Sequence, residues 1–501
     1  MTPPVLMAAL GLCLVSGVFL PAGAVAADRP SVIPEVPVTA TDLRRSEANN
    51  SPALAADPTQ PRFVALAHRS DAPEFSCGLQ VSGDGGRGWQ PADPVPVLPE
   101  GAEKCYAPEV AFDRKGRLYY LFLGLQGLGN SPMGAFLTSS ADRGRTWAQP
   151  QMVLGPENYM VRMAIDPTLG SDGRIHLVWL RTATQPGLGG LPAGPNPIVA
   201  AHSDDGGRTF TEPVQISDPA RPRSVAPSVA LGGDHAVHVA YFDLRDDAVD
   251  YQGLEGAVWP GEWSVVVTSS TDGGEHWGPG AAVDDRLVPP GRVMLVFTMP
   301  PPALAADRSG RLFAGWWDSR NGDPDVFLAR STDGGRTWEP PTRLNDDREG
   351  DGSDQYLLRL SVAPHGRVDA VFLDRRNDPR NLRNDAYLTY SADNGRTFAP
   401  NVRITEKSSD SRIGQAYYVP SAKGLVEFGS RLAIISRPTA ALAAWPDTRN
   451  ATLGSTQQDV FATEVLLPGS DGSGPNWMPF GAAAGVVVLV AAGVLAVRGR
   501  R

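Results

Sequence analysis

Three arginines occupy the same position in a pattern that recurs along the chain. Aligning the strand-like segment that opens each recurrence places seven residues in one register: Ala53, Glu109, Arg162, Ser228, Ala303, Arg359 and Arg431. A guanidinium group donates two parallel hydrogen bonds to a carboxylate and stays charged at neutral pH. Each of the three arginines is therefore suited to a carboxylate, with pairing to neighbouring acidic side chains as the structural interpretation.

A second set of charged residues repeats after the second strand-like segment of four recurrences. Its members share the spacing Asp-x-Arg: Asp243 and Arg245, Asp318 and Arg320, Asp374 and Arg376, Asp447 and Arg449. Loops at this point share a face with the starts of the first strands, so these groups are expected to ring the same pocket. Their repetition favours a structural role as Asp–Arg pairs, because a ligand site is usually built from unique residues.

Six copies of one octet define the recurrence. Each reads Ser-x-Asp-x-Gly-x-x-aromatic, and the copies begin at Ser82, Ser140, Ser203, Ser270, Ser331 and Ser391. The steps between these serines are 58, 63, 67, 61 and 60 residues, which is typical of a repeated structural unit. Serine and aspartate side chains cap turn amides and glycine adopts positive φ, so the octet is predicted to form a hairpin corner.

Strand-like segments surround every octet in the same order. Two alternating segments joined by a glycine turn precede a third that enters the octet, and a short fourth follows the aromatic residue. Four strands per unit of about 60 residues is the plan of a propeller blade. A seventh unit, starting at Arg431, lacks an octet and a fourth strand. The segment 35–39, upstream of the first unit, stands where the repeat would place this missing strand. We expect an all-β propeller of seven four-stranded blades closed by this N-terminal strand, with six blades as the alternative.

Composition agrees with many short strands and tight turns. The 501 residues include 54 glycines and 46 prolines, and only 8% are aromatic, which excludes a coiled coil or an all-α fold. The formal net charge of −10 argues against a nucleic-acid partner.

Both ends of the chain read as targeting segments. Residues 1–27 contain an apolar run and a small-x-small cleavage pattern, which predicts a secretory signal. The propeller is expected over 28–467, a flexible linker over 468–477, a transmembrane helix over 478–497 and a basic cytoplasmic tail over 498–501. The protein is thus expected in the cell membrane, as a single-pass chain with its propeller outside.

Two cysteines remain once the signal is removed. Cys77 and Cys105 are expected to form one structural disulfide in an oxidising environment outside the cell, without catalytic function. No cofactor is predicted. The acidic stretch 346–354 is a weak candidate for a calcium loop, with a solvated loop as the favoured alternative.

The octets resemble the Asp boxes, or bacterial neuraminidase repeats, and the chain over roughly 35–467 resembles the sialidase-like propeller superfamily. This resemblance implies an exo-α-sialidase with three arginines, at the starts of innermost strands, that hold the carboxylate of the sugar. Arg162, Arg359 and Arg431 match that set because they fall on the third, sixth and seventh blades. Asp boxes also occur in proteins that cut nothing, so the resemblance is specific for fold and weak for function.

The same resemblance implies a tyrosine nucleophile activated by a glutamate, and an aspartate as acid/base. Tyr106 is the nucleophile candidate, with Glu349 or Asp354 as its activator. The alternative is that Tyr106 is only a packed side chain beside the disulfide. Tyr417 and Tyr418 are spare candidates. The loop 182–197, where the acid/base is expected, contains no carboxylate, so only a rim acid such as Asp246 or Asp247 could replace it.

We therefore expect a cell-surface propeller that binds an acidic glycan or glycoconjugate and hydrolyses terminal sialic acid if its catalytic set is complete. The main alternative is a non-catalytic propeller for adhesion or envelope assembly with a protein partner. A glycosidase for neutral glycans would need a pair of rim carboxylates at hydrolytic separation.

Overall fold

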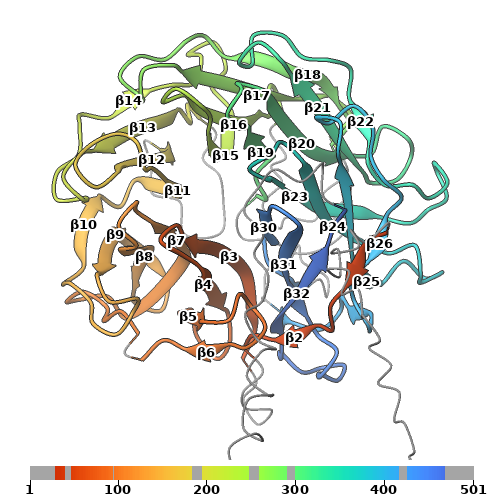
Figure 1. The fold of residues 1–501 in the computed structure, drawn as a ribbon, viewed down its shortest axis with the longest axis horizontal. Coiled ribbons are helices and arrows are strands. Elements are labelled where there is room, and N and C mark those ends of the chain that lie inside the picture. Colours follow the sequence, from red (N-terminus) through yellow and green to blue (C-terminus); the bar gives the residue numbers. More distant parts are fainter. Residues whose placement is uncertain are drawn as a thin grey trace, which may run out of the picture.

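The computed structural model describes residues 29–39, 47–93, 95–182, 194–247, 259–289, 299–416 and 426–468. Every regular element in these ranges is a strand. Seven antiparallel sheets surround a central axis, and one short hairpin lies apart from them (Figure 1). The protein is a seven-bladed β-propeller, which confirms the all-β prediction and rules out the six-blade alternative.

Each of the first six blades is built from consecutive strands. Blade 1 holds β3 (Asn49–Asp57), β4 (Gln60–Ser70), β5 (Ser76–Ser82) and β6 (Gln90–Pro91), and blade 2 holds β7 (Lys104–Phe112), β8 (Leu118–Gln126), β9 (Ser131–Ser140) and β10 (Gln151–Leu154). Blade 3 holds β11 (Asn158–Asp166), β12 (Arg174–Arg181), β13 (Ile198–Ser203) and β14 (Val214–Gln215), and blade 4 holds β15 (Ser224–Leu231), β16 (Val237–Asp243), β17 (Trp263–Ser270) and β18 (Ala281–Leu287). Blade 5 holds β19 (Ala303–Ala306), β20 (Leu312–Asp318), β21 (Asp325–Ser331) and β22 (Thr342–Arg343), and blade 6 holds β23 (Gln355–Val362), β24 (Val368–Asp374), β25 (Arg383–Ser391), β26 (Val402–Arg403) and β27 (Ser409–Asp410).

The seventh blade joins the two ends of the described chain. Its strands β30 (Ala433–Arg437), β31 (Ala440–Asp447) and β32 (Asp459–Leu466) are completed by β1 (Ser31–Val32) and β2 (Val36–Pro37), which both pair with β32. The predicted closing segment 35–39 is thus confirmed, and β1 extends it. Val38, which follows β2, is 1% exposed and packs with residues of blades 1 and 7. A separate hairpin, β28 (Gln415–Ala416) and β29 (Val426–Glu427), precedes blade 7.

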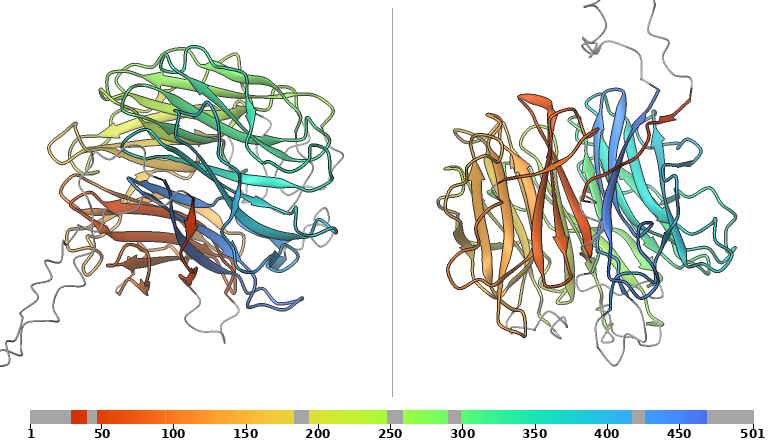
Figure 2. Two further views of the ribbon diagram at one scale, coloured as in Figure 1. Left: turned by 45° about the vertical axis from the view of Figure 1, so that its right-hand side comes forward. Right: turned by 90° about the horizontal axis from the view of Figure 1, so that it is seen from below.

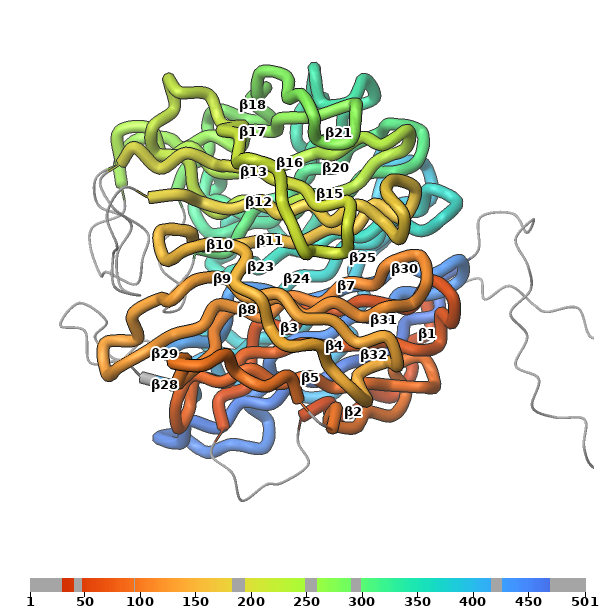
Figure 3. Tube along the Cα trace, turned by 90° about the vertical axis from the view of Figure 1, so that its left-hand side faces the viewer, coloured from red at the N-terminus to blue at the C-terminus, as the bar shows by residue number. Residues whose placement is uncertain are grey.

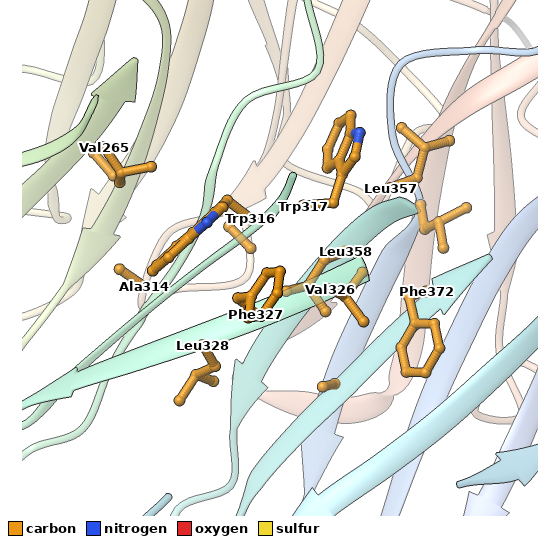
Figure 4. Close-up of a cluster of buried hydrophobic side chains, with 14 of the residues drawn as sticks. Val265, Ala314, Trp316, Trp317, Val326, Phe327, Leu328, Leu357, Leu358 and Phe372 are labelled. Atoms are coloured by element: carbon orange, nitrogen blue, oxygen red, sulfur yellow. The ribbon is translucent and has the colours of Figure 1, made fainter. Parts of the chain in front are cut away.

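The hydrophobic core lies between the blades, because each sheet packs its faces against its two neighbours (Figure 2). Between blades 5 and 6, the rings of Trp316 and Phe327 stack at 6.3 Å and lie near Leu358 (Figure 4). The indole N–H of Trp316 donates to Asp318 at 2.9 Å, so a large aromatic group is buried without an unpaired donor.

All six octets form the same turn, between the third and fourth strands of their blades. In each octet the serine hydroxyl donates to the aspartate at 2.7–2.8 Å. The same hydroxyl accepts from the amide of the second glycine position at 2.7–2.9 Å. The predicted hairpin corner is therefore a closed local hydrogen-bond unit.

The disulfide expected between Cys77 and Cys105 is present and joins β5 of blade 1 to β7 of blade 2. The predicted signal, transmembrane helix and cytoplasmic tail lie outside the described residues, as does nearly all of the linker. Within the ranges given above, no helix has the length and apolar character needed to span a bilayer.

Candidate functional site

The innermost strands share a bulge that positions one residue of each at the propeller axis. In five blades a non-glycine residue with positive φ precedes that residue by two: Ser51, Ala107, Met160, Ala226 and Leu357. The bulge interrupts the ladder between the first and second strands, for example between Tyr159 and Arg162. The inner strands pair only with the second strand of their own blade, so their other edge faces the axis.

A cavity of about 270 Å³ lies on this axis and is lined by residues from six of the seven innermost segments. Arg162, Arg359 and Arg431 all line it, so three arginines from separate blades converge on one space. Glu109 and Ser228, from the same register, line it as well. The wall therefore combines charged side chains with the free edges of the inner strands.

Glu109 bridges two of the three arginines. Its Oε1 accepts from Arg162 Nη1 at 2.7 Å and also contacts Arg431 Nη1. Burial alone would raise the pKa of Glu109, but Arg431 and Arg162 outweigh it and hold the pKa below its usual value. Glu109 is thus an ionised counterion shared by two guanidinium groups.

Arg359 is the third cation, and no hydrogen bond or ion pair is found for it among the described residues. It lies deep inside the molecule but is partly exposed, because the cavity reaches it. Burial, followed by the positive charges of Arg162 and Arg431, lowers its pKa to about 9, so it remains a cation at neutral pH. Three guanidinium groups and one carboxylate give the cluster a net charge of +3 − 1 = +2.

Two details of the arginine register need correction. Arg162 and Arg359 lie in the middle of β11 and β23, not at the starts of the innermost strands. Arg431 lies two residues before β30, whose ladder begins with Ala433 opposite Ala444. It still reaches the cavity because it follows Gly429, a residue with φ of 94°, in the way that Arg162 follows Met160.

Tyr106 does not line the cavity. It is completely buried, and its hydroxyl accepts from Arg69 Nη1 at 2.6 Å. Arg69 in turn pairs with Glu427 at 2.7 Å and with Asp71 at 2.6 Å. The tyrosine therefore belongs to a buried network that joins blades 1 and 2 to the hairpin β28–β29. This network lies next to Arg431, on which Arg69 acts electrostatically.

The two candidate activators also lie away from the cavity lining. Glu349 is exposed in the connection between β22 and β23. Asp354 precedes β23 and pairs with Arg375 at 3.0 Å. Burial raises the pKa of Asp354, although Arg375 opposes this rise. Tyr417 and Tyr418 fall outside the described residues.

The two rim acids differ in exposure. Asp246 is exposed, whereas Asp247 is 2% exposed and accepts from the indole N–H of Trp263 at 2.8 Å. Neither lines the cavity. The three arginines therefore line one cavity, as predicted. None of the five described catalytic candidates lines that cavity.

The Asp-x-Arg repeats are structural, as their repetition indicates. In all four, the aspartate accepts from the backbone N–H of the arginine at 2.7–3.0 Å. Three of the four arginines also pair with the same aspartate: Arg320 with Asp318, Arg376 with Asp374, and Arg449 with Asp447. In blade 4, Asp243 pairs with Arg221 at 2.7 Å instead. The expectation that these groups ring the pocket is wrong, since none of them lines the cavity.

In the acidic stretch 346–354, three carboxylates already have partners in the protein. Asp346 pairs with Arg376, Asp347 pairs with Arg343, and Asp351 accepts from Ser353. No three His, Cys, Asp or Glu side chains come together as a metal site anywhere in the described ranges.

Two functional residues were missed in the sequence although the alignment contained them. Glu109 and Ser228 stand in the same register as Arg162, but only the arginines were selected. The Ser228 hydroxyl is buried and has no hydrogen-bond partner in the described structure. Together with Arg359, it is a polar group at the axis that a ligand could satisfy.

Comparison with known proteins gives weak similarities. No model of a known protein family matches the chain. Over 337 residues the chain is 26% identical to a xyloglucanase from Paenibacillus sp, in a match that covers 63% of this chain and 28% of the xyloglucanase. The chain thus spans little more than a quarter of that relative's length.

The solved structures to which the chain is similar are more distant in sequence. The phage phi92 endosialidase is 10% identical, with 89% of this chain and 71% of that chain covered and a TM-score of 0.47. The intramolecular trans-sialidase from Ruminococcus gnavus is 12% identical, with 68% and 92% covered and a TM-score of 0.44. A protein of unknown function from Dyadobacter fermentans is 13% identical, with 87% and 99% covered and a TM-score of 0.47. These similarities leave the ligand of this chain unassigned.

Proposed function

We propose that the protein is a cell-surface propeller that binds an acidic glycan through Arg162, Arg359 and Arg431. The observation that carries this proposal is Arg359, a cation at the end of an axial cavity without a carboxylate partner in the described structure. Leaving a guanidinium group in a partly desolvated space is costly unless an anion pairs with it. A ligand carboxylate would supply that pairing.

The walls of the cavity support a hydroxylated ligand. Backbone N–H and C=O groups along the free edges of the inner strands have no strand partner on the axial side, and the Ser228 hydroxyl is unpaired. Sugar hydroxyls can satisfy such groups, whereas an aliphatic acid would leave them without partners. The similarity to a protein named as a xyloglucanase agrees with a carbohydrate ligand.

Hydrolysis of terminal sialic acid is the stronger form of this proposal. It requires Tyr106 as nucleophile, with Glu349 or Asp354 as activator, and the described positions of these residues favour binding without hydrolysis. We also propose that a signal over 1–27 and a helix over 478–497 place the protein in the membrane with the propeller outside.

The proposal is tested by titrating the purified full chain with N-acetylneuraminate and 3′-sialyllactose at low salt in a calorimeter. Both acids are expected to bind, lactose is not, and Arg359→Gln should weaken binding at least about tenfold because a charged hydrogen-bond donor is lost. Arg396→Gln is the matched control, since it removes the same charge from an exposed octet position. A fluorogenic sialoside assayed alongside reports hydrolysis. If neither acid binds, or if Arg359→Gln binds as the wild type does, the proposal is wrong.

A further inference from the structure

The two faces of the propeller can be told apart by the direction of its strands. First and third strands run parallel within each blade, since both are antiparallel to the second strand. The octets follow the third strands, so they lie on the face where the first strands end. We call this face, with the octets and the hairpins between first and second strands, the octet face.

The chain leaves the propeller on the octet face. β32 is the third strand of blade 7, and its end lies beside the octet of blade 1, where Arg87 contacts Glu464 at 3.2 Å. Arg437, at the end of β30, donates to the carbonyl of Gly85 in the same octet at 2.8 Å. Seen from the side, β1, which pairs with the end of β32, and the hairpin β28–β29 lie at opposite ends of the molecule (Figure 3).

In four of the seven inner strands, burial changes abruptly at or near the arginine register. In β15, residues 224–228 are buried and residues 229–231 are partly exposed. In β23, residues 355–358 are buried and residues 359–362 are partly exposed. β3 and β30 show the same change, after Pro52 and Ala433. The residues that line the cavity beyond the arginines also lie on this later side. Solvent therefore reaches the arginines along the strand ends.

The opposite direction is closed in the described structure. Met160, Ala226 and Leu357, which precede the register by two residues, are 5%, 0% and 2% exposed. Two of the arginines also make hydrogen bonds to carbonyl groups of the bulges. Arg162 Nε donates to Pro227 O at 3.2 Å, and Arg431 Nε donates to Ser51 O at 3.1 Å. Within the described ranges, the cavity is therefore closed at this inner end.

We propose that the acidic ligand enters from the octet face and presents its charged end to the arginines at the blind inner end of the cavity. This inference rests on the proposed function, since it concerns the same site. It adds that the end of the glycan chain is recognised. It also adds that the entry route lies on the face from which the polypeptide leaves.

Two alanines on one strand test the direction of entry. Ala226 and Ala230 flank Ser228 on β15, and Ala226 is buried whereas Ala230 is partly exposed. The two described cysteines form a disulfide, so in the full chain with Cys13→Ser each new cysteine is the single free thiol. Ala230→Cys and Ala226→Cys are treated with the anionic reagent sulfonatoethyl methanethiosulfonate and its cationic trimethylammonioethyl analogue.

Ala230→Cys is expected to react with the anionic reagent at least about tenfold faster than Ala226→Cys. Its preference for the anionic over the cationic reagent should exceed that of a free thiol, because the cluster is positive. Ser361→Cys and Leu357→Cys on β23 form a second pair, so a folding failure in one strand does not remove the test. Melting temperatures of all four variants confirm the fold.

Faster reaction at Ala226→Cys and Leu357→Cys would overturn the inference, as would equal rates within both pairs. Labelling needs no sugar, so its outcome is separate from that of the titration. If Ala230→Cys reacts as expected and N-acetylneuraminate neither binds nor slows the reaction, the route stands and the assignment of the ligand fails.

Discussion

At the scale of residues, the site is defined by an imbalance of charge. Glu109 neutralises part of the charge of Arg162 and Arg431, and Arg359 has no such partner in the described structure. The shared carboxylate also fixes the two arginines across blade boundaries, because they come from blades 3 and 7 and Glu109 comes from blade 2. Glu109 therefore both stabilises the cluster and limits its affinity for anions.

Glu109→Gln tests this double role. The amide keeps the shape of the side chain and removes its charge, which changes the cluster from +2 to +3. We expect the free energy of unfolding to fall by about 1–3 kcal/mol, because two buried cations lose their counterion. Affinity for N-acetylneuraminate should rise several-fold at low salt, and less at high salt. Calorimetric titration measures the affinity, with Glu100→Gln, an exposed position, as the control. Unchanged affinity and stability would contradict the role given to Glu109.

At the scale of elements, two local devices repeat around the ring. In five blades a bulge in the inner strand turns one side chain toward the axis, and in six blades the octet closes the corner between the third and fourth strands. The octet needs only its own residues. In blade 5 the hydroxyl and backbone N–H of Thr337 donate to Asp333 and, against a smaller effect of burial, lower its pKa to about 2.

Asp333→Asn should therefore act on stability in a pH-dependent way. Because the pKa of Asp333 is lower in the folded state than its usual value of 3.8, its carboxylate stabilises the fold above about pH 4. This contribution is lost as the pH falls from about 4 to about 2. The aspartate is largely exposed to solvent screening, so we expect a melting temperature only about 1–2 °C lower than that of the wild type at pH 7. The difference should vanish near pH 2. Calorimetry from pH 2 to 7, with the exposed Asp246→Asn as control, measures it; a constant difference at all pH values would contradict the interpretation.

At the scale of the whole molecule, the ring is closed by strands from opposite ends of the sequence. β1 and β2 add to β32, Arg449 contacts Glu35, and Val38 is buried between blades 1 and 7. Closure removes the exposed edge that an open blade 7 would present. It also places the start and the end of the described chain on one blade.

Val38→Asp is expected to weaken the contact between the N-terminal strands and blade 7. A carboxylate at a position that is 1% exposed has no water or partner, so the free energy of unfolding should fall by about 2–4 kcal/mol. Limited proteolysis should then cut the N-terminal segment sooner than in the wild type. Val97→Asp, at a position that is 68% exposed, serves as control and should change neither measurement. Equal stability of the two variants would show that closure does not depend on this contact.

Sequence alone determined the features that depend on neighbouring residues. The octet turns, the strand order within a blade and the disulfide of Cys77 and Cys105 follow from local patterns or pairing chemistry, and counting the units leads to seven blades. The register also identified the three arginines that meet at the axis.

Only the tertiary structure decided how those arginines are paired. A residue with positive φ two positions upstream directs each of them to the axis. Glu109 from another blade neutralises part of their charge, which no alignment of single strands reveals. The face on which the cavity opens depends on where seven strands stop packing against each other. The exposure of Arg359 is thus a property of the assembled ring, because its surroundings come from blades distant in sequence.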